Sequence, residues 1–337
     1  MTDPRGEQTV DEASAVVVTI NGKPRQVPDG VSLFELLQQL DVQPNRVVVE
    51  HNREIKRKDD FESTRVHAGD ELELVYFVGG GAADDTFVVG GRTIRSRLIH
   101  GTGKFASNAV LAQCLEAAQP DMITVAIRRL NLEGGRSELE GIDLRRFTLL
   151  PNTAGATTAE AAVRLARMAR AAGMSDFIKV EVVGDEDTLL PDPEATLQAT
   201  RQLVKEGFIV MPYTSDDVVQ AIRLFEAGAA AVMPGAAPIG TTLGLQNLLN
   251  LELIVSKVSV PVIVDAGLGV PSEAARCLEI GAAGVLVNTA IARAKNPPEM
   301  ARAFAEAVVA GRRAFNAGRA HIGLKAVASS PVEGVPV

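Results

Sequence analysis

Short apolar runs broken by turn residues fill the chain from residue 15 to residue 76. Asn21-Gly22 is a typical hairpin turn, and Ser32 stands three residues before Glu35, the spacing of a helix-capping box. The pattern predicts one helix after Ser32 and four strands, at residues 16–20, 23–27, 47–49 and 71–76. A hairpin, one helix and two further strands predict a small α+β domain of the ubiquitin-like β-grasp type.

Beyond residue 85 the pattern becomes a regular alternation of short apolar runs with stretches rich in Ala, Leu and Glu. The apolar runs predict eight strands, at Leu98–Gly101, Met122–Ile127, Thr148–Pro151, Phe177–Val183, Ile209–Tyr213, Ala230–Met233, Val262–Asp265 and Gly284–Asn288. Eight strands with helical connections over about 240 residues predict an α/β fold of the (β/α)8 TIM-barrel type. Residues 87–94 predict a hairpin that closes the bottom of the barrel. An open doubly wound sheet is the alternative, although residues 101–106 lack the Gly-x-Gly-x-x-Gly turn that often follows its first strand.

The composition is that of a cytoplasmic globular protein. The chain has 337 residues, 46% of them apolar and 23% charged, which is enough to build a large core. Its formal net charge of −8 argues against a nucleic-acid partner. The two cysteines lie in helical patterns and suggest a reducing compartment, and the polar residues 1–14 predict a disordered tail rather than a signal peptide. No apolar run is long enough to span a membrane.

The fourth predicted barrel strand carries two ionisable residues near the C-terminal ends of the strands, where a TIM barrel has its chemistry. Lys179 and Glu181 are two positions apart and therefore point to the same face, while Ile178, Val180 and Val182 take the face under the helices. A buried ion pair is costly to keep for stability alone. We therefore expect Lys179 to be a Schiff-base nucleophile whose pKa the apolar barrel interior lowers toward neutrality.

Glycines and short polar residues follow the sixth, seventh and eighth predicted strands. Asp265 ends the seventh strand and Gly267 follows it, Asn288 and Thr289 stand at the end of the eighth, and Gly240 lies in the loop after the sixth. Backbone amides at such positions bind anions, and the loops after strands seven and eight are the usual phosphate site of this fold. The pattern predicts a phosphorylated carbonyl substrate. The four histidines have no ligand spacing, so no metal site is expected.

At these residues the chain resembles the bacterial thiazole synthase family, and the similarity extends over residues 86 to about 332. Several segments carry it, namely residues 96–105, 124–131, 150–155, 179–182, 189–193, 211–217 and 265–272. Residues 15–81 resemble the matching sulfur-carrier protein, whose chain ends in a Gly-Gly that bears a thiocarboxylate. Here Gly80 and Gly81 occupy that place, yet the chain continues. The resemblance therefore implies a fusion of three parts: a carrier domain at 15–81, a linker at 82–85 and a synthase domain at 86–337.

The resemblance also implies an activity, that of a transferase which builds the thiazole of thiamin. Lys179 would form an imine with 1-deoxy-D-xylulose 5-phosphate. Glu181 and Asp265 would move protons while sulfur from the carrier thiocarboxylate and dehydroglycine complete the ring. The family positions that contact this substrate are matched by Gly240, Ala266, Gly267, Asn288 and Thr289. No metal, nicotinamide or pyridoxal cofactor is implied. The implied partners are a carrier-activating adenylyltransferase and further copies of the chain, in a dimer or tetramer.

Two other functions fit part of the pattern. A Schiff-base phosphosugar aldolase would use the lysine and the phosphate loops, but it leaves residues 15–81 without a role. A sulfur-carrier or docking module with a purely structural barrel would have no need of Lys179, Glu181 and Asp265 together.

The junction between the two predicted domains poses a chemical question of its own. The carbonyl carbon of Gly81 is bound to the nitrogen of Ala82, so it offers no carboxylate that could become a thiocarboxylate. Cleavage after Gly81 is the favoured solution, and delivery by a separate carrier is the other.

Overall fold

The computed structural model describes residues 15–40, 42, 47–56, 60–76, 85–127, 139–320 and 322. The chain divides into two compact units, Met1–Gly80 and Gly81–Val337, and each is described here by itself. The expected tail at residues 1–14 and the Gly80-Gly81 pair lie outside the described residues.

The first unit has the β-grasp arrangement that the sequence predicts. Its five-stranded sheet has the order β2-β1-β7-β4-β5, with β1 and β7 parallel at the centre and an antiparallel partner on either side. A short ladder pairs β3 with β6, and α1 packs its apolar face into the core beside the sheet. The elements are β1 (Ala15–Ile20), β2 (Lys23–Pro28), β3 (Val31–Ser32), α1 (Leu33–Gln39), β4 (Val47–His51), β5 (Glu54–Lys56), β6 (Arg65–Val66) and β7 (Glu71–Tyr76).

Two local sequence signals set the start of this unit, and both are confirmed. Asn21 and Gly22 have φ values of 49° and 72°, the positive pair that a tight turn between β1 and β2 requires. The Ser32 hydroxyl accepts a hydrogen bond from the Glu35 amide, and the Glu35 carboxylate accepts one from the Ser32 amide at 3.0 Å. This capping box begins α1 and directs Leu36 and Leu37 into the core.

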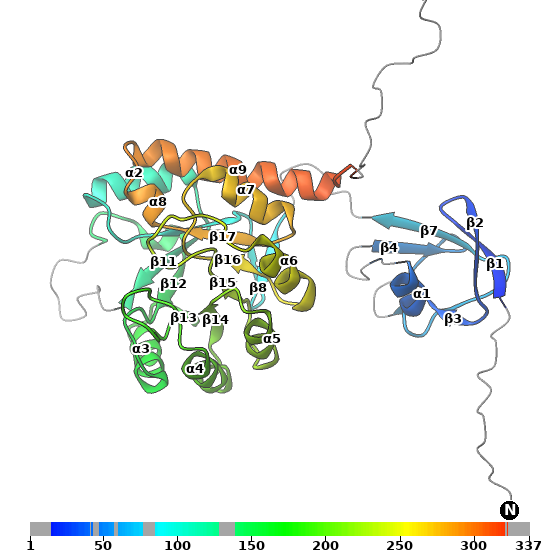
Figure 1. Ribbon diagram of the computed structural model, residues 1–337, viewed down its shortest axis with the longest axis horizontal. Helices are drawn as coiled ribbons and strands as arrows, with labels where there is room; N and C mark the ends of the chain where they lie inside the picture. Colours follow the sequence, from blue (N-terminus) through cyan, green and yellow to red (C-terminus); the bar gives the residue numbers. More distant parts are fainter. Residues whose placement is uncertain are drawn as a thin grey trace, which may run out of the picture. The chain divides into compact units, whose positions relative to one another are not determined.

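The second unit is a barrel of eight parallel strands (Figure 1). The sheet order is β15-β14-β13-β12-β11-β10-β17-β16, and isolated bridges from Val232 to Val262 and from Gly235 to Asp265 join its two ends. All eight predicted strands are confirmed, although several begin or end at other residues than expected. Their bounds are β10 (Leu98–Gly101), β11 (Met122–Ala126), β12 (Thr148–Asn152), β13 (Phe177–Val180), β14 (Ile209–Thr214), β15 (Met233–Pro234), β16 (Ile263–Val264) and β17 (Gly284–Val287).

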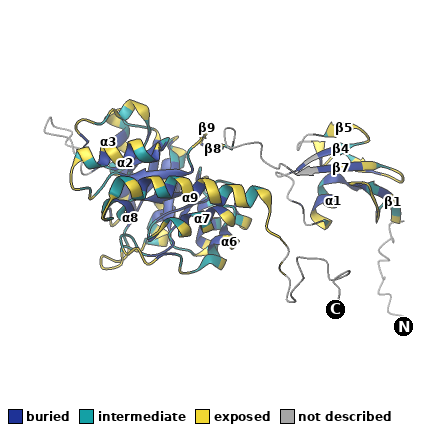
Figure 2. Cartoon of the chain, turned by 90° about the horizontal axis from the view of Figure 1, so that it is seen from above, coloured by how far each residue is buried: buried dark blue, intermediate teal, exposed yellow. Residues whose placement is uncertain are grey.

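Helices cover the outside of the barrel, with their buried sides facing the strands and their exposed sides facing outward (Figure 2). In the described part of the chain, no helix is long and apolar enough to cross a membrane. The helices are α2 (Asn108–Ala118), η3 (Leu144–Arg146), α3 (Ala159–Ala171), α4 (Pro193–Lys205), α5 (Val218–Glu226), α6 (Leu248–Lys257), α7 (Pro271–Glu279), α8 (Thr289–Ala292) and α9 (Pro297–Ala317).

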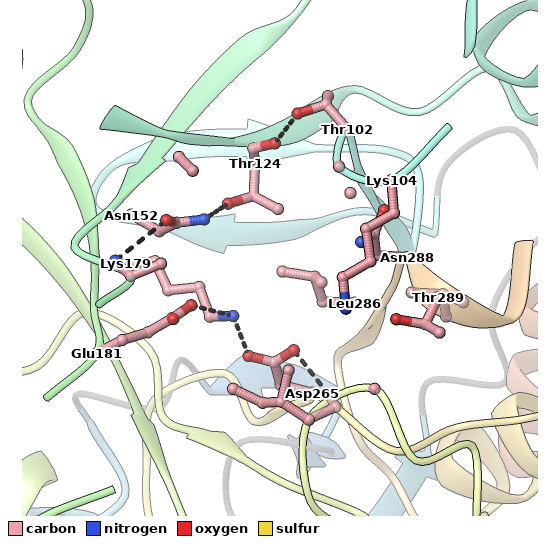
Figure 3. Close-up of a pocket in the computed structure, with 18 of the residues that line it drawn as sticks. Thr102, Lys104, Thr124, Asn152, Lys179, Glu181, Asp265, Leu286, Asn288 and Thr289 are labelled. Carbon is pink, nitrogen blue, oxygen red and sulfur yellow. Dashed lines mark hydrogen bonds and ion pairs between the residues drawn. The ribbon is translucent and has the colours of Figure 1, made fainter. Parts of the chain in front are cut away.

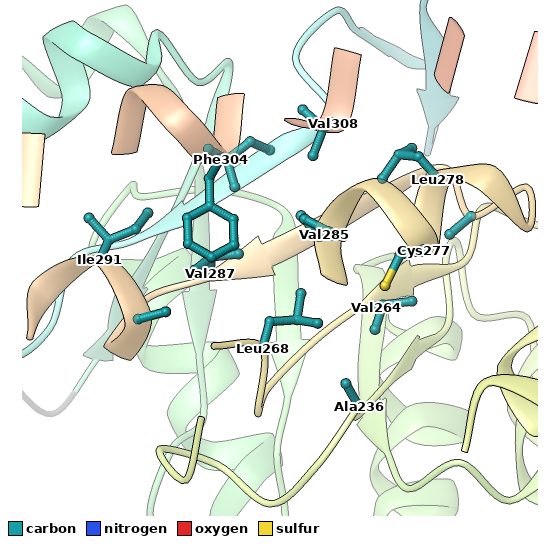
Figure 4. Close-up of a cluster of buried hydrophobic side chains, with 14 of the residues drawn as sticks. Ala236, Val264, Leu268, Cys277, Leu278, Val285, Val287, Ile291, Phe304 and Val308 are labelled. Carbon is teal, nitrogen blue, oxygen red and sulfur yellow. The ribbon is translucent and has the colours of Figure 1, made fainter. Parts of the chain in front are cut away.

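The largest buried cluster of the described residues lies mainly between the barrel strands and helices α7 and α9 (Figure 4). Phe304 and Val308 from α9 meet Cys277 and Leu278 from α7 above Val285 of β17, and all five are at most 2% exposed. Burial raises the pKa of the Cys277 thiol to about 12, so this cysteine stays protonated and acts as a small apolar side chain.

The predicted hairpin before the first barrel strand is confirmed as β8 (Phe87–Val89) and β9 (Arg92–Ile94). Val89 and Ile94 are each 1% exposed and pack with inward side chains of the barrel strands, among them Met122, Leu150 and Ile263. The hairpin therefore closes one end of the barrel, and the other end stays open for a site.

Asp85, the first described residue of this unit, is held by two arginines. Its carboxylate accepts hydrogen bonds from Arg97, just before β10, at 2.7 Å and from Arg312, near the end of α9, at 2.9 Å. Burial works against the charged form of Asp85, but the two guanidinium groups outweigh it and hold the pKa of this carboxyl below its usual value. The start of the unit is thus fixed at the end of the barrel where β10 begins.

Candidate active site

A cavity of about 300 Å³ opens at the C-terminal ends of the barrel strands. This is the end at which TIM barrels carry their sites, and the volume is that of a small-molecule pocket. The lining comes mainly from the residues that end or follow the strands, and it includes all eight residues that the sequence singled out in the synthase domain: Lys179, Glu181, Gly240, Asp265, Ala266, Gly267, Asn288 and Thr289.

Lys179 lies between two carboxylates at the base of this cavity (Figure 3). Its Nζ is 2.9 Å from Glu181 Oε1 and in contact with Asp265 Oδ2. The three residues are 4%, 8% and 2% exposed, so the charges are almost fully removed from water. The expectation that Lys179 and Glu181 share the inner face of one strand is confirmed, and Asp265 joins them from β16, across the barrel.

The strand period explains why the lysine points inward. Ile178, Val180 and Val182 belong to a core cluster under α3 and α4, which leaves Lys179 and Glu181 on the other face. The strand itself ends at Val180. Beyond that point Thr153 supports the chain, because its hydroxyl donates to the Glu181 carbonyl and accepts from the Glu181 amide, both at 2.8 Å. Thr153 therefore positions the glutamate, a role that the sequence alone did not reveal.

The charge state of Lys179 differs from the sequence-based expectation. Burial alone would lower the pKa of this amine, but Asp265 and Glu181 outweigh burial and raise its pKa above the ordinary value. Burial also raises the pKa of the Asp265 carboxyl, against the attraction of Lys179. The expectation of a lowered lysine pKa is therefore wrong. It took account of the apolar barrel interior but not of the Asp265 carboxylate, which follows β16. A raised pKa favours the ammonium form of Lys179.

A second set of side chains forms the wall next to the lysine. Asn152 Nδ2 donates to Thr124 Oγ1 at 3.0 Å, and the Thr102 hydroxyl donates to the Thr124 carbonyl at 2.8 Å. Tyr213 does not line the cavity, but its ring is 2% exposed and its ring centre is 5.5 Å from Lys179 Nζ. Sequence reasoning did not assign Asn152 or Tyr213 to the site, although both stand at or beside strand ends, which is the one signal that could have found them.

Another part of the lining is formed largely by backbone, at Gly240 and at the residues that follow Asp265. Gly240 and Gly267 have φ values of 80° and 75°, and Ala266 shares this left-handed conformation at 52°. The amide of Ala266 donates to Asp265 Oδ1 at 2.7 Å. Within the described residues, the amides of Gly240, Gly267 and Thr289 donate to no protein group. Free amides around one space are a preformed anion site.

The two glycines differ in what a side chain would meet. A Cβ on Gly267 would lie 2.5 Å from the backbone nitrogen of Ala237, so this glycine is required for the close approach of two loops. A Cβ on Gly240 would instead point into open space, 3.5 Å from Lys104 Nζ and 3.9 Å from Thr289 Oγ1. That space, bordered by an ammonium group, a hydroxyl and free amides, has the polarity of a phosphate site.

Within the described residues, His, Cys, Asp and Glu side chains form no group of three or more that could hold a metal ion. His100 is fully buried at the end of β10, where burial lowers its pKa to about 4 and its Nδ1 lies 2.6 Å from the Gly101 carbonyl. It packs against Phe105 and does not line the cavity.

Comparisons with known proteins agree with this geometry. Residues 88–331 match the family described as thiazole biosynthesis protein ThiG, and residues 18–81 match the ThiS family. Thiazole synthases of Bacillus subtilis and of a Geobacillus species are each 53% identical over 251 residues, which cover 74% of this chain and 98% of each relative. The crystal structure of the Amycolatopsis orientalis BexX/CysO complex contains a chain 31% identical to this one, with a TM-score of 0.64, covering 71% of this chain and 98% of that one.

Replacement of Lys179 should destabilise the barrel in a pH-dependent way. Lys179→Ala leaves two buried carboxylates without their cation, and loss of one partner from a buried pair costs about 3–5 kcal/mol. Without the lysine the raised pKa of Asp265 rises further. The folded variant then binds a proton that the unfolded chain releases, so its free energy of unfolding falls as the pH rises. We expect the full loss near about pH 8 and a smaller loss near about pH 5.

Urea unfolding followed by circular dichroism, at both pH values, measures this difference. Lys205→Ala is the matched control, because Lys205 is an exposed lysine at the end of α4. A loss of the same size at both pH values would show that the carboxylates do not depend on Lys179 for their charge.

Proposed function

The chain belongs to the thiazole synthase family of thiamin biosynthesis, and from this premise we propose that its barrel joins 1-deoxy-D-xylulose 5-phosphate, dehydroglycine and carrier-bound sulfur through an imine on Lys179. The chain is an enzyme of this family with a ThiS domain fused before it. One observation supports the finer proposal above all others. A buried lysine lies between two carboxylates at the base of a cavity, and the same cavity has an anion-binding wall at Gly240, Gly267 and Thr289, called the phosphate wall below.

The first step must free the amine of Lys179. Nζ already contacts Asp265 Oδ2, so one proton can pass along this contact and leave a neutral amine beside a neutral acid. Burial raises the pKa of Asp265, which favours this acceptor, and two neutral groups cost less to keep out of water than two ions. The amine then attacks the ketone carbon of the substrate, and loss of water gives the imine.

Glu181 and Asp265 then have complementary positions for proton transfer. Both carboxylates lie within hydrogen-bonding reach of the same nitrogen, so they can also reach the carbons next to it. One can remove a proton from a carbon next to the imine while the other returns a proton to an oxygen that leaves or rearranges. Sulfur enters from the carrier thiocarboxylate, and dehydroglycine supplies the nitrogen and carbon that close the ring. The chain's residues supply the proton transfers without a metal, nicotinamide or pyridoxal group.

The phosphate of the substrate fits the part of the lining formed by the loops after β16 and β17 and by Gly240. Backbone amides at Gly240, Gly267 and Thr289 are free within the described residues, and the loops after β16 and β17 are the usual phosphate site of a TIM barrel. Asn288 and Ala266 complete this wall. The aldolase alternative would use the same groups, but the match of residues 18–81 to a sulfur carrier favours thiazole synthesis.

Sulfur delivery requires a free carboxylate at the end of the carrier. We propose that an endopeptidase hydrolyses the bond between Gly81 and Ala82, which gives a carrier that ends at Gly81 and a synthase that begins at Ala82. An adenylyltransferase can then activate the new carboxylate. The anchorage of Asp85 by Arg97 and Arg312 supports this proposal, because these contacts hold the start of the barrel without help from the carrier. We expect the barrel to assemble as a dimer or tetramer, which sedimentation would test.

Borohydride reduction in the presence of 1-deoxy-D-xylulose 5-phosphate should attach the substrate carbons to Lys179. Peptide mapping locates the adduct, and Lys179→Ala should abolish it. An adduct of unchanged mass in this variant would show that the imine forms on another residue, and it would refute the central proposal.

Glu181 should act after the imine has formed, whereas Asp265 should act both before and after it. We expect Glu181→Gln to keep the trapped adduct while thiazole formation falls about 10²–10⁴-fold, the usual contribution of an acid–base group. Asp265→Asn should still give the adduct, but more slowly because the proton acceptor of Lys179 is lost, and its thiazole formation should fall by a similar factor. Near-normal turnover in both variants would remove their proposed roles.

The phosphate wall is best tested at Gly240, because a side chain at Gly267 would displace Ala237. The Cβ in Gly240→Ala would enter the anion space, so the variant should bind the phosphorylated ketose much more weakly while binding its unphosphorylated analogue nearly as before. Gly207→Ala is the matched control, since Gly207 has a φ of 75° and nothing within 4 Å of its Cβ position. Equal weakening for both ketoses would contradict the placement of the phosphate.

Intact mass measurement of the protein from its native cell tests the cleavage. We expect a fragment that ends at Gly81, part of it heavier by one oxygen-to-sulfur exchange. Full-length protein alone, making thiazole with its own carrier as the sole sulfur source, would contradict the proposal.

A further inference from the structure

We infer that Lys104, from the loop after the first barrel strand, binds the substrate phosphate and is the residue through which the cavity selects phosphorylated ketoses. This inference deepens the proposed function and rests on it for the identity of the substrate.

The charge balance of the cavity calls for a further cation. Among the described residues that line it, only Lys104, Lys179, Glu181 and Asp265 are charged. Lys179 with its two carboxylates carries a formal charge of −1 (+1 −2). A phosphate monoester is close to a dianion at neutral pH, so this triad alone would repel the substrate. Lys104 brings the formal charge of these four residues to zero, and no ion pair ties its charge to either carboxylate within the described residues.

Strand order brings Lys104 to the phosphate wall. β10 pairs with β17 as its neighbour in the barrel, so the loop after β10 lies beside Asn288 and Thr289, which follow β17. Figure 3 shows Lys104 next to Asn288, on the side of the cavity opposite Lys179 and Glu181. Lys104 Nζ and Thr289 Oγ1 border the open space in front of Gly240, at 3.5 Å and 3.9 Å from the position that a Cβ on this glycine would take.

The backbone of Lys104 is held in an unusual conformation. Its φ of 69° lies in the left-handed region, which a residue with a Cβ seldom adopts outside tight turns and functional sites. Within the described residues, its ammonium group has no carboxylate partner. A lysine without such a partner, directed at free amides and a hydroxyl, is arranged to receive an anion.

Binding of inorganic phosphate, measured by calorimetry, tests the site without requiring any chemistry. We expect Lys104→Gln to weaken this binding about tenfold or more, which is the loss of one charge-assisted hydrogen bond. Lys104→Arg should retain most of it, because the charge is kept. Lys205→Gln, at the end of α4 and outside the cavity, is the matched control and should bind phosphate as the parent chain does.

Imine trapping extends the test to the substrate. Lys104→Gln should raise the concentration of 1-deoxy-D-xylulose 5-phosphate that gives half-maximal adduct by about tenfold or more, and it should leave trapping of unphosphorylated 1-deoxy-D-xylulose within about twofold of the parent. A purely structural role would weaken both ketoses alike, and that result would overturn the inference. So would phosphate binding that is unchanged in Lys104→Gln. Failure of the parent chain to trap either ketose would instead refute the imine on Lys179, while the phosphate measurement would still decide the role of Lys104.

Discussion

The buried contact of one ammonium group with two carboxylates is the constraint on which the synthase unit depends. Lys179, Glu181 and Asp265 are each at most 8% exposed, so none can exchange its partner for water at low cost. Lys179 lies on β13, Glu181 just after it and Asp265 just after β16, so the contact forms only when the barrel has closed. The groups proposed to be catalytic are therefore assembled by the same event that completes the fold.

This arrangement would also let a protonated lysine serve as the proposed nucleophile. In a purely apolar cavity the lysine would lose its proton to solvent, and its neutral amine would then have no hydrogen-bond partner. Here the proton stays with an acceptor in direct contact, so the neutral amine appears only when the proton has moved to Asp265. The same proton is then available for the departing water of imine formation. Two carboxylates around one amine thus store the proton that the later steps require.

Residue periodicity was sufficient to predict most of the fold and to bring the proposed site residues to one cavity. The two-residue spacing of Lys179 and Glu181 fixed their common face, and the strand-end positions of Asp265 and Asn288 placed them at the same end of the barrel. The raised pKa of the lysine could not be predicted in this way, because it depends on a contact between residues far apart in the sequence.

Two other features of the site depend on contacts between loops, and periodicity gives no information about these. Thr153 holds both backbone groups of Glu181 from a neighbouring strand, and nothing in its sequence context distinguishes it from any other threonine at a strand end. Lys104 reaches the space before Gly240 only because the first and last barrel strands are neighbours and because its φ of 69° turns the chain there. Neither the neighbour relation nor the conformation of a single loop residue can be derived from a hydrophobic pattern.

The two ends of the barrel have separate roles, one structural and one proposed to be chemical. Because of this separation, the fusion of the carrier domain does not interfere with the proposed site. At one end the hairpin of β8 and β9 fills the interior, and Asp85 is bound by Arg97 and Arg312. At the other end lie the lysine, the carboxylates and the phosphate wall. The carrier domain is joined in sequence to the structural end, only four positions before Asp85 at Gly81. Hydrolysis of the junction would therefore leave the contacts of Asp85 in place and would not disturb any residue of the cavity. One gene would then supply the carrier and the synthase in equal amounts, and neither protein would constrain the chemistry of the other.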